Sequence, residues 1–198
     1  MEQHVADPYV RRARALGYRS RAAFKLAEID RADRLFAPGQ RVVDLGAAPG
    51  GWSQVAAEKV GALGQVIAVD LLEMAPLPGV TVIRGDFTET AVVREVERAL
   101  GAGPVDLVLS DMSPNLSGVA AADQARSVHL CELAVEFGLA YLKPGGSLLV
   151  KAFQGEGFPA FLRRLRTSFE RVASRKPDAS RSRSSEMYLL ARGPRGGR

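Results

Sequence analysis

The chain has 198 residues, of which 46% are hydrophobic and 25% are charged, a balance typical of one globular domain and too apolar for a disordered chain. Its apolar stretches end well before the roughly 18 residues that a membrane-spanning helix needs, and its first residues lack the apolar core of a signal peptide. One cysteine allows no internal disulfide, and with two histidines it offers few metal ligands. We therefore expect a single cytoplasmic domain with no bound metal and no membrane contact.

The net charge of +5 is unevenly distributed along the chain. Residues 1–41 carry nine basic and five acidic side chains, residues 42–150 carry six and thirteen, and residues 151–198 carry twelve and four. Most of the basic residues are arginines, whose planar guanidinium suits phosphate oxygens, although a GC-rich genome produces the same bias. The basic ends of the chain therefore indicate a polyanionic partner.

Apolar runs of strand length alternate with longer periodic segments, the pattern of a parallel sheet flanked by helices. Ser20 is placed to cap a first helix that runs to about Asp33. The residues of this helix that we expect to face inward are Ala22, Leu26, Ile29 and Ala32. We expect strands at 41–46, 65–70, 80–84, 105–110 and 146–152, and further helices at about 51–60, 88–100, 122–142 and 157–168.

The alternation stops after the last of these helices. Segments 169–175 and 187–192 have the pattern of two strands joined by the polar stretch 176–185, which predicts an antiparallel hairpin at one side of the sheet. The fold class is therefore α/β, with a mostly parallel sheet covered by helices on both faces. We expect the single domain to have its core at about 20–192, a short basic arm at 1–19 and a frayed tail at 193–198.

The strongest local signal is the glycine-rich segment DLGAAPGGW (44–52), which leaves the first strand and enters a helix. Glycines allow the backbone to approach a bound cofactor closely, and a helix N-terminus offers unpaired N–H groups. The spacing departs from the dinucleotide-binding pattern GxGxxG, since Gly46 is followed by two alanines and a proline. A tight turn that binds no ligand remains the alternative.

Aspartates stand at the ends of three successive expected strands, at Asp70, Asp86 and Asp111. Ligands of open α/β sheets bind at the carboxyl ends of the strands, and an acid after the second strand commonly holds the ribose of a cofactor. Each aspartate alone is consistent with a helix cap or a turn. The three together favour a binding site.

Lys151 interrupts an apolar strand near its end, where a buried ammonium is costly unless it is paired or used. The alternative is a lysine that reaches past the strand end to solvent. Lys25 presents a similar choice at the inward edge of its helix, whereas Glu186 carries no signal by itself. The remaining candidates do not suggest a catalytic nucleophile paired with a general base. They are His4, His129 and Cys131.

Five segments resemble, in order, the FtsJ/RrmJ-type ribosomal RNA 2′-O-methyltransferases, the large-subunit methyltransferase E family of bacteria. They are SRAAFKLAEID (20–30), DLGAAPGGWSQ (44–54), SDMSPNLSG (110–118), LLVKAFQGEGF (148–158) and RKPDASRSRSSEMYL (175–189). The resemblance runs from about Tyr9 to Ala191. It implies the Rossmann-like fold of S-adenosylmethionine-dependent methyltransferases, with a seven-stranded sheet whose last hairpin is antiparallel.

The resemblance also assigns residues and a substrate. The tetrad of the family falls on Lys25, Asp111, Lys151 and Glu186, with Lys151 as the proton acceptor. Its S-adenosylmethionine-binding positions fall on Gly50, Trp52, Asp70, Asp86 and Asp111. The implied substrate is a uridine 2′-hydroxyl in the A-loop of 23S ribosomal RNA within the large subunit, and we expect the enzyme to be a monomer. The short N-terminal arm departs from bacterial relatives.

The chemistry of the reaction agrees with this assignment. Methyl transfer to a ribose hydroxyl needs in-line alignment and partial removal of a proton from a weak acid. Burial and the nearby cation Lys25 favour a neutral Lys151 that accepts this proton, whereas Asp111 and Glu186 favour the ammonium. We expect the RNA to be contacted by arginines of the basic ends, namely Arg11, Arg12, Arg14, Arg181 and Arg183.

Three other functions remain to be compared with this one. A methyltransferase acting on base amino groups typically carries an Asp/Asn-Pro-Pro-aromatic motif after the fourth strand, and residues 111–115 (DMSPN) lack the aromatic. An RNA-binding protein without activity would not need an intact tetrad. A nicotinamide oxidoreductase is the least consistent with the glycine-rich turn.

Overall fold

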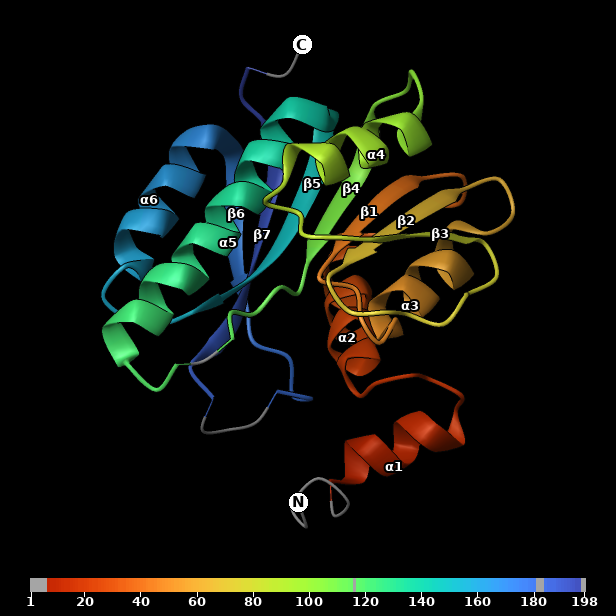
Figure 1. Ribbon diagram of the computed structural model, residues 1–198, viewed down its shortest axis with the longest axis horizontal. Coiled ribbons are helices and arrows are strands. Elements are labelled where there is room, and N and C mark those ends of the chain that lie inside the picture. Colours follow the sequence, from red (N-terminus) through yellow and green to blue (C-terminus); the bar gives the residue numbers. More distant parts are fainter. Residues whose placement is uncertain (1–6, 116, 181–183, 197–198) are drawn as a thin grey trace.

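The computed structural model describes residues 7–115, 117–180 and 184–196, which form one seven-stranded sheet with helices on both faces (Figure 1). The strand order is β3-β2-β1-β4-β5-β7-β6. Strands β1 to β5 pair in parallel, and β7 pairs antiparallel to both β5 and β6. The strands are β1 (Arg41–Leu45), β2 (Gln65–Asp70), β3 (Val80–Arg84), β4 (Val105–Ser110), β5 (Leu142–Phe153), β6 (Phe169–Arg175) and β7 (Glu186–Pro194). The expected α/β architecture and final hairpin are confirmed.

Two apolar cores hold the helices against the sheet. One core joins α4, α5 and α6 to one face, and the other joins α2 and α3 to the opposite face. The inner strands are apolar on both sides because both faces are covered. The helices are α1 (Pro8–Ala15), α2 (Ala22–Asp33), α3 (Gly51–Val60), α4 (Thr90–Leu100), α5 (Ala120–Tyr141) and α6 (Phe158–Ser168). No helix in the described ranges is long and apolar enough to cross a membrane.

Helix α1 is an element that the sequence analysis missed within the basic arm. Asp7 caps it by accepting a hydrogen bond from the backbone N–H of Tyr9 at 2.9 Å, and Pro8 fits the first turn because it lacks an N–H to satisfy. Its apolar side consists of Tyr9 and the buried Ala13, which pack with Phe24 of α2. The helix escaped notice because its apolar stripe is short and lies between arginines.

Other boundaries also differ from the expectation. Helix α2 begins at Ala22, and neither Ser20 nor another side chain caps it. Ala32 is exposed, so the inward stripe of α2 ends at Ile29. Strand β5 begins at Leu142, where α5 ends, and β7 extends to Pro194. The carboxyl ends of the parallel strands form the lower edge of the sheet in Figure 1. The shifts leave these ends where the sequence predicts them.

Candidate active site

Four charged side chains that are far apart in the sequence meet at the carboxyl edge of the sheet. Asp111 directly follows β4, Lys151 lies near the end of β5, Glu186 begins β7, and Lys25 comes from α2. The antiparallel register places Lys151 opposite Tyr188 and Phe153 opposite Glu186. Because side chains alternate across a strand, this register brings Glu186 and Tyr188 of β7 to the same side of the sheet as Lys151. The structure therefore assembles all four residues of the expected tetrad.

The tetrad forms two ion pairs. Lys25 Nζ lies 2.5 Å from Glu186 Oε1, and Lys151 Nζ lies 3.0 Å from Asp111 Oδ1. Lys151 Nζ also donates a hydrogen bond to the backbone carbonyl oxygen of Asp111 at 2.6 Å. The lysine side chains are 9% and 7% exposed and the carboxylates 13% and 20%, so the pairs are shielded from water but open on one side. Pairing satisfies charges that would otherwise be costly to bury.

Tyr188 connects the two ion pairs and was missed by the sequence analysis. Lys25 Nζ lies 3.3 Å from the Tyr188 hydroxyl, which donates a hydrogen bond to Asp111 Oδ1 at 3.2 Å. Burial, followed by the charges of Asp111 and Glu186, raises the pKa of Tyr188, so the hydroxyl keeps its proton. A signal was present, since Tyr188 stands two residues after Glu186 on one strand and a buried tyrosine hydroxyl needs a partner.

The carboxylate of Glu186 is held in its ionised form. Burial alone opposes ionisation, but the hydrogen bond and charge of Lys25, the charge of Lys151 and the hydrogen bond from Ser180 together lower the pKa of Glu186. Ser180 Oγ lies 3.2 Å from the same oxygen that receives Lys25. Lys25 is thus oriented by two acceptors, the Glu186 carboxylate and the Tyr188 hydroxyl.

The glycine-rich turn lies beside this tetrad and packs closely against other parts of the protein. Gly46 and Gly50 adopt φ values of +75° and +107°, which favour glycine. A Cβ atom at Gly46 would lie 2.8 Å from Met112, and one at Gly50 would lie 2.9 Å from the Leu77 side chain. Helix α3 starts directly after Gly50 with no side chain capping it, so its first N–H groups are oriented to receive a ligand.

The aspartates at the ends of β2 and β3 flank the turn. Asp70 Oδ2 accepts a hydrogen bond from Ala48 N at 2.9 Å, which ties the carboxylate to the glycine-rich turn. Asp86 Oδ1 accepts bonds from the hydroxyl and backbone N–H of Thr88, and these bonds lower the pKa of Asp86. Both aspartates are partly exposed carboxylate acceptors at the carboxyl edge, and their role in binding a cofactor stays a prediction.

Asp44 is a further acid beneath the turn that the sequence analysis did not single out as a site residue. It is fully buried in β1, and Ser53 Oγ donates to its Oδ2 at 2.6 Å while Oδ1 has no partner among the described residues. Burial raises the pKa of Asp44 to about 7 against the effect of the Ser53 bond, and the charges of Asp111 and Asp70 add to the rise. An unpartnered buried oxygen beneath a glycine-rich turn fits a site that a ligand completes.

The ring of Trp52 is packed inside the protein and is not placed to contact a cofactor. The ring is 2% exposed, its Nε1 donates to the Ala22 carbonyl oxygen at 2.8 Å, and it packs on Tyr188 with centroids 5.5 Å apart. The cofactor role of Trp52 stays a prediction.

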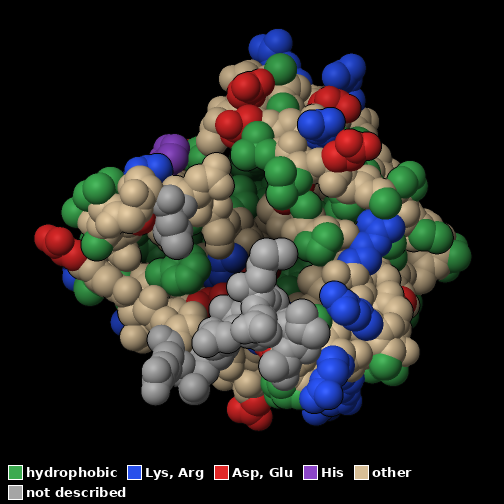
Figure 2. All heavy atoms as spheres, turned by 60° about the horizontal axis from the view of Figure 1, so that its bottom comes forward, with side chains coloured by type: hydrophobic (Ala, Val, Ile, Leu, Met, Phe, Trp, Pro, Cys, Tyr) green, Lys and Arg blue, Asp and Glu red, His purple; other side chains and the backbone are tan. Residues whose placement is uncertain are grey.

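The basic residues expected to contact RNA are placed only in part. Arg11, Arg12 and Arg14 are exposed on α1, whereas Arg181 and Arg183 lie outside the described residues. Figure 2 looks toward the carboxyl edge and shows a hollow with Lys and Arg side chains gathered along one side of it.

His129 is exposed on α5, and Cys131 is buried with its Sγ 3.2 Å from the Lys151 carbonyl oxygen. The two residues therefore do not form a catalytic pair of a nucleophile and a general base.

Comparison with known proteins places this arrangement in a family. The chain is 60% identical over 190 residues to the ribosomal RNA large subunit methyltransferase E of Azoarcus sp. (strain BH72), covering 96% of this chain and 93% of that one. It is 62% identical to the protein of the same name from Halorhodospira halophila, covering 97% and 91%.

Solved structures share the fold of this chain. A ribosomal RNA methyltransferase from Plasmodium falciparum superposes with a TM-score of 0.79 at 28% identity, covering 91% of this chain and all of that one. A SAM-dependent O-methyltransferase from Thermotoga maritima, at 15% identity and a TM-score of 0.56 over 86% of this chain and 65% of that one, shares the fold alone. Residues 18–194 match the model of the FtsJ-like methyltransferases, and the chain belongs to this family.

Proposed function

We propose that the protein transfers a methyl group from S-adenosylmethionine to the ribose 2′-hydroxyl of a uridine in 23S ribosomal RNA within the large subunit, acting as a cytoplasmic monomer. The observation that carries this proposal is the pair of buried lysine–carboxylate contacts, joined by Tyr188, beside the glycine-rich turn. Relatives at 60% and 62% identity carry the name ribosomal RNA large subunit methyltransferase E, which supports the choice of RNA.

The residues at the cofactor side fit S-adenosylmethionine. Asp70 and Asp86 offer carboxylate acceptors suited to ribose hydroxyls and to the adenine amino group, and the start of α3 has no side-chain cap. Asp111 and the unpartnered Asp44 Oδ1 supply acceptors for the methionine ammonium. When bound, the cofactor supplies an electrophilic methyl group on a sulfonium.

Lys151 is the residue that we assign to the hydroxyl proton. Its Nζ has two acceptors, the carboxylate and the backbone carbonyl of Asp111. A neutral amine has two hydrogens for these acceptors and one lone pair left for the 2′-hydroxyl proton. Lys25, held by Glu186 and Tyr188, provides a fixed positive charge that favours the developing alkoxide.

The direct test is methyl transfer to the natural substrate. Purified large subunits from a bacterial strain that lacks this methyltransferase are incubated with the protein and tritium-labelled S-adenosylmethionine, and the labelled nucleotide is mapped. We expect one labelled uridine carrying a 2′-O-methyl group, and no label with Lys151→Ala. Label on a base, or none with the parent protein, contradicts the proposal.

The exposed arginines of α1 supply the RNA-facing charge in this proposal. Replacing Arg11, Arg12 and Arg14 by Gln should weaken subunit binding and reduce the slope of log affinity against log salt by about one for each arginine that binds a phosphate. A control replaces Arg94 and Arg98, which are exposed on α4, in the background of the parent and in that of the double variant Arg11→Gln/Arg12→Gln, which removes the same number of charges. If the α1 variant keeps the parental salt slope, these arginines are a solvated surface without an RNA contact.

A further inference from the structure

The loop that follows β2 runs beside the glycine-rich turn and has no regular secondary structure. Residues 71–79 connect Asp70 to β3, and of these residues only Met74 is buried. Met74 packs with Ala47 of the glycine-rich turn, and Leu77 lies against the same apolar cluster. Two apolar side chains thus anchor a loop whose other residues are exposed.

The guanidinium of Arg19 ties this loop to the glycine-rich turn. Its Nη1 donates hydrogen bonds to the carbonyl oxygens of Ala75 at 2.6 Å and of Pro49 at 3.3 Å, and its Nη2 donates to that of Pro76 at 2.8 Å. A guanidinium has five N–H donors in one plane and keeps its charge at working pH, so it can bind carbonyls of two segments at once.

Gly50 leaves room for this contact. A Cβ atom at Gly50 would lie 2.9 Å from Leu77 Cδ1, 3.0 Å from Met74 Sδ and 3.2 Å from Arg19 Cδ. The loop and the stem of Arg19 therefore pack on the residue that precedes α3. The bonds of Arg19 join the neighbour of Gly50 to the loop that follows Asp70, which are the two segments assigned to the cofactor.

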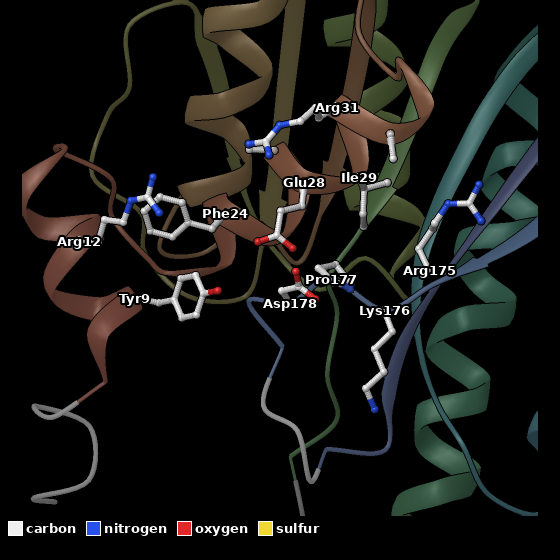
Figure 3. Close-up of a pocket in the computed structure, with 12 residues that line it drawn as sticks. Tyr9, Arg12, Phe24, Glu28, Ile29, Arg31, Arg175, Lys176, Pro177 and Asp178 are labelled. Carbon is white, nitrogen blue, oxygen red and sulfur yellow. The ribbon is translucent and has the colours of Figure 1, made fainter.

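The backbone around Arg19 is itself held in place. Arg19 N donates to Gln54 Oε1 at 2.7 Å, and Gln54 Nε2 donates to the Gly17 carbonyl oxygen at 3.0 Å, so this segment is attached to α3. The preceding helix α1 is attached to α2, since Tyr9 lies beside Phe24 with ring centroids 5.8 Å apart (Figure 3). Arg19 thus extends from an anchored segment to a loop with few anchors of its own.

We propose that Arg19 is a positioning residue for S-adenosylmethionine, which holds the loop 71–79 on the glycine-rich turn and so keeps Asp70 and Gly50 in the arrangement that the cofactor binds. A loop that is ordered before binding spares the cofactor the entropy cost of ordering it. The effect belongs to cofactor affinity and not to methyl transfer, because Arg19 binds backbone carbonyls. This inference rests on the proposed function, because S-adenosylmethionine is the ligand that the loop borders.

The test measures S-adenosylmethionine affinity by calorimetry. Arg19→Gln loses the charge and the reach of the guanidinium, so its Kd should rise about tenfold, and Arg19→Lys, which keeps the charge but has one nitrogen, should show a smaller rise. The control is Arg41→Gln. Arg41 begins β1 at the opposite edge of the sheet and also binds loop carbonyls, those of Pro104 at 3.1 Å and of Leu100. Arg41→Gln should unfold at lower urea concentration and keep the parental cofactor affinity.

Two further measurements distinguish positioning from a general structural role. Amide hydrogen exchange in the absence of cofactor should be faster across residues 71–79 in Arg19→Gln and unchanged there in Arg41→Gln. With large subunits as substrate, Arg19→Gln should raise the KM for S-adenosylmethionine about tenfold and leave kcat and the KM for subunits unchanged. Parental cofactor affinity in a folded Arg19→Gln protein, or an equal loss in Arg41→Gln, overturns the assignment. A raised KM for subunits with unchanged cofactor affinity also overturns it and assigns Arg19 to the RNA.

The behaviour of the parent protein separates this inference from the proposed function. Cofactor binding that depends on Arg19, without methylation of subunits, removes the proposed function and retains the role of Arg19. Methylation by the parent with an unchanged KM for S-adenosylmethionine in Arg19→Gln removes the role of Arg19 and retains the function. A parent protein that does not bind S-adenosylmethionine removes both.

Discussion

The two halves of the carboxyl edge differ in how far the protein satisfies its own polar groups. In the transfer half, formed by β4, β5, β7 and α2, both lysines have carboxylate partners and Tyr188 links the pairs. In the cofactor half, formed by the ends of β1, β2 and β3, helix α3 has no side-chain cap and Asp44 Oδ1 lacks a partner among the described residues. The transfer half is thus preorganised, whereas the half that we assign to the cofactor keeps groups without a partner.

The same difference appears in the charge balance. The transfer half combines two cations with two anions, and the lysines lower the pKa of Glu186. In the cofactor half, burial raises the pKa of Asp44, and the charges of Asp111, from the neighbouring transfer half, and of Asp70 add to the rise. A cationic sulfonium cofactor suits the second environment and not the first.

The largest effect is expected in the transfer half, at Lys151. Lys151→Ala should lower the single-turnover rate by a factor of about 100 to 10,000, the range for loss of a general base, because no other group replaces its Nζ. Cofactor affinity should change little, since most of the residues assigned to the cofactor lie on the other half. Lys151→Arg keeps the positive charge but cannot release its proton at working pH, so it should be nearly as inactive.

Single-turnover rates of the three proteins across pH, at saturating cofactor and subunits, distinguish the roles. A base role requires a parental rate that rises with pH, and a Lys151→Arg rate that does not. Substantial activity in Lys151→Arg would show that the charge suffices and would remove the proton-acceptor assignment. Substantial activity in Lys151→Ala would remove Lys151 from the mechanism.

The next effect is on stability and belongs to the cofactor half. The folded pKa of Asp44 is about 7 and its ordinary value is 3.8, so between these values the folded state keeps a proton that the unfolded state has lost. The free energy of unfolding therefore falls as pH rises through this window, by up to about 1.4 kcal/mol per pH unit, and the loss levels off above about 7. Asp44→Asn, which keeps the acceptor for Ser53, should remove this dependence.

Urea unfolding of both proteins from pH 5 to pH 8 provides the measurement. The stability of Asp44→Asn relative to the parent should increase with pH and become constant above about 7. Ser53→Ala removes the bond that lowers the pKa of Asp44, so the dependence should extend to higher pH in that variant. Parallel curves for Asp44→Asn and the parent would show that Asp44 is already ionised in the folded protein at pH 5.

The sheet and the tetrad were predictable to the extent that their signals are local. Apolar runs bounded by turns place the strands, and the carboxyl ends of parallel strands bring Asp70, Asp86 and Asp111 to one edge without any knowledge of packing. Lys151 was conspicuous because a charge interrupts an apolar strand. Glu186 was found only through the family resemblance, since its role depends on the register between β5 and β7.

What could not be predicted depends on contacts between distant segments. The link through Tyr188 needs the pairing of Lys151 with Tyr188 across two strands, and the packing of the Trp52 ring needs α2 to lie over α3. Helix α1 is stabilised by a cap and by packing on Phe24 rather than by a strong periodic pattern. The spacing of Glu186 and Tyr188 places both side chains on one face of a strand, but no spacing in the sequence identifies the distant partners of such contacts.

The smallest effect is expected at Asp70, and it sharpens the contrast with Lys151. Asp70 holds the turn through Ala48 N and the following loop through Leu72 N, so Asp70→Ala leaves these donors unpaired and removes an acceptor for the cofactor. Calorimetry with S-adenosylmethionine should show affinity weakened by about 1–3 kcal/mol, with a smaller loss for Asp70→Asn, which retains one acceptor oxygen. Once cofactor is saturating, the single-turnover rate should return close to that of the parent, the reverse of the pattern at Lys151. Unchanged affinity in a folded Asp70→Ala protein would contradict the placement of the cofactor, and a rate that stays low at saturation would show that the two halves of the edge are not separable.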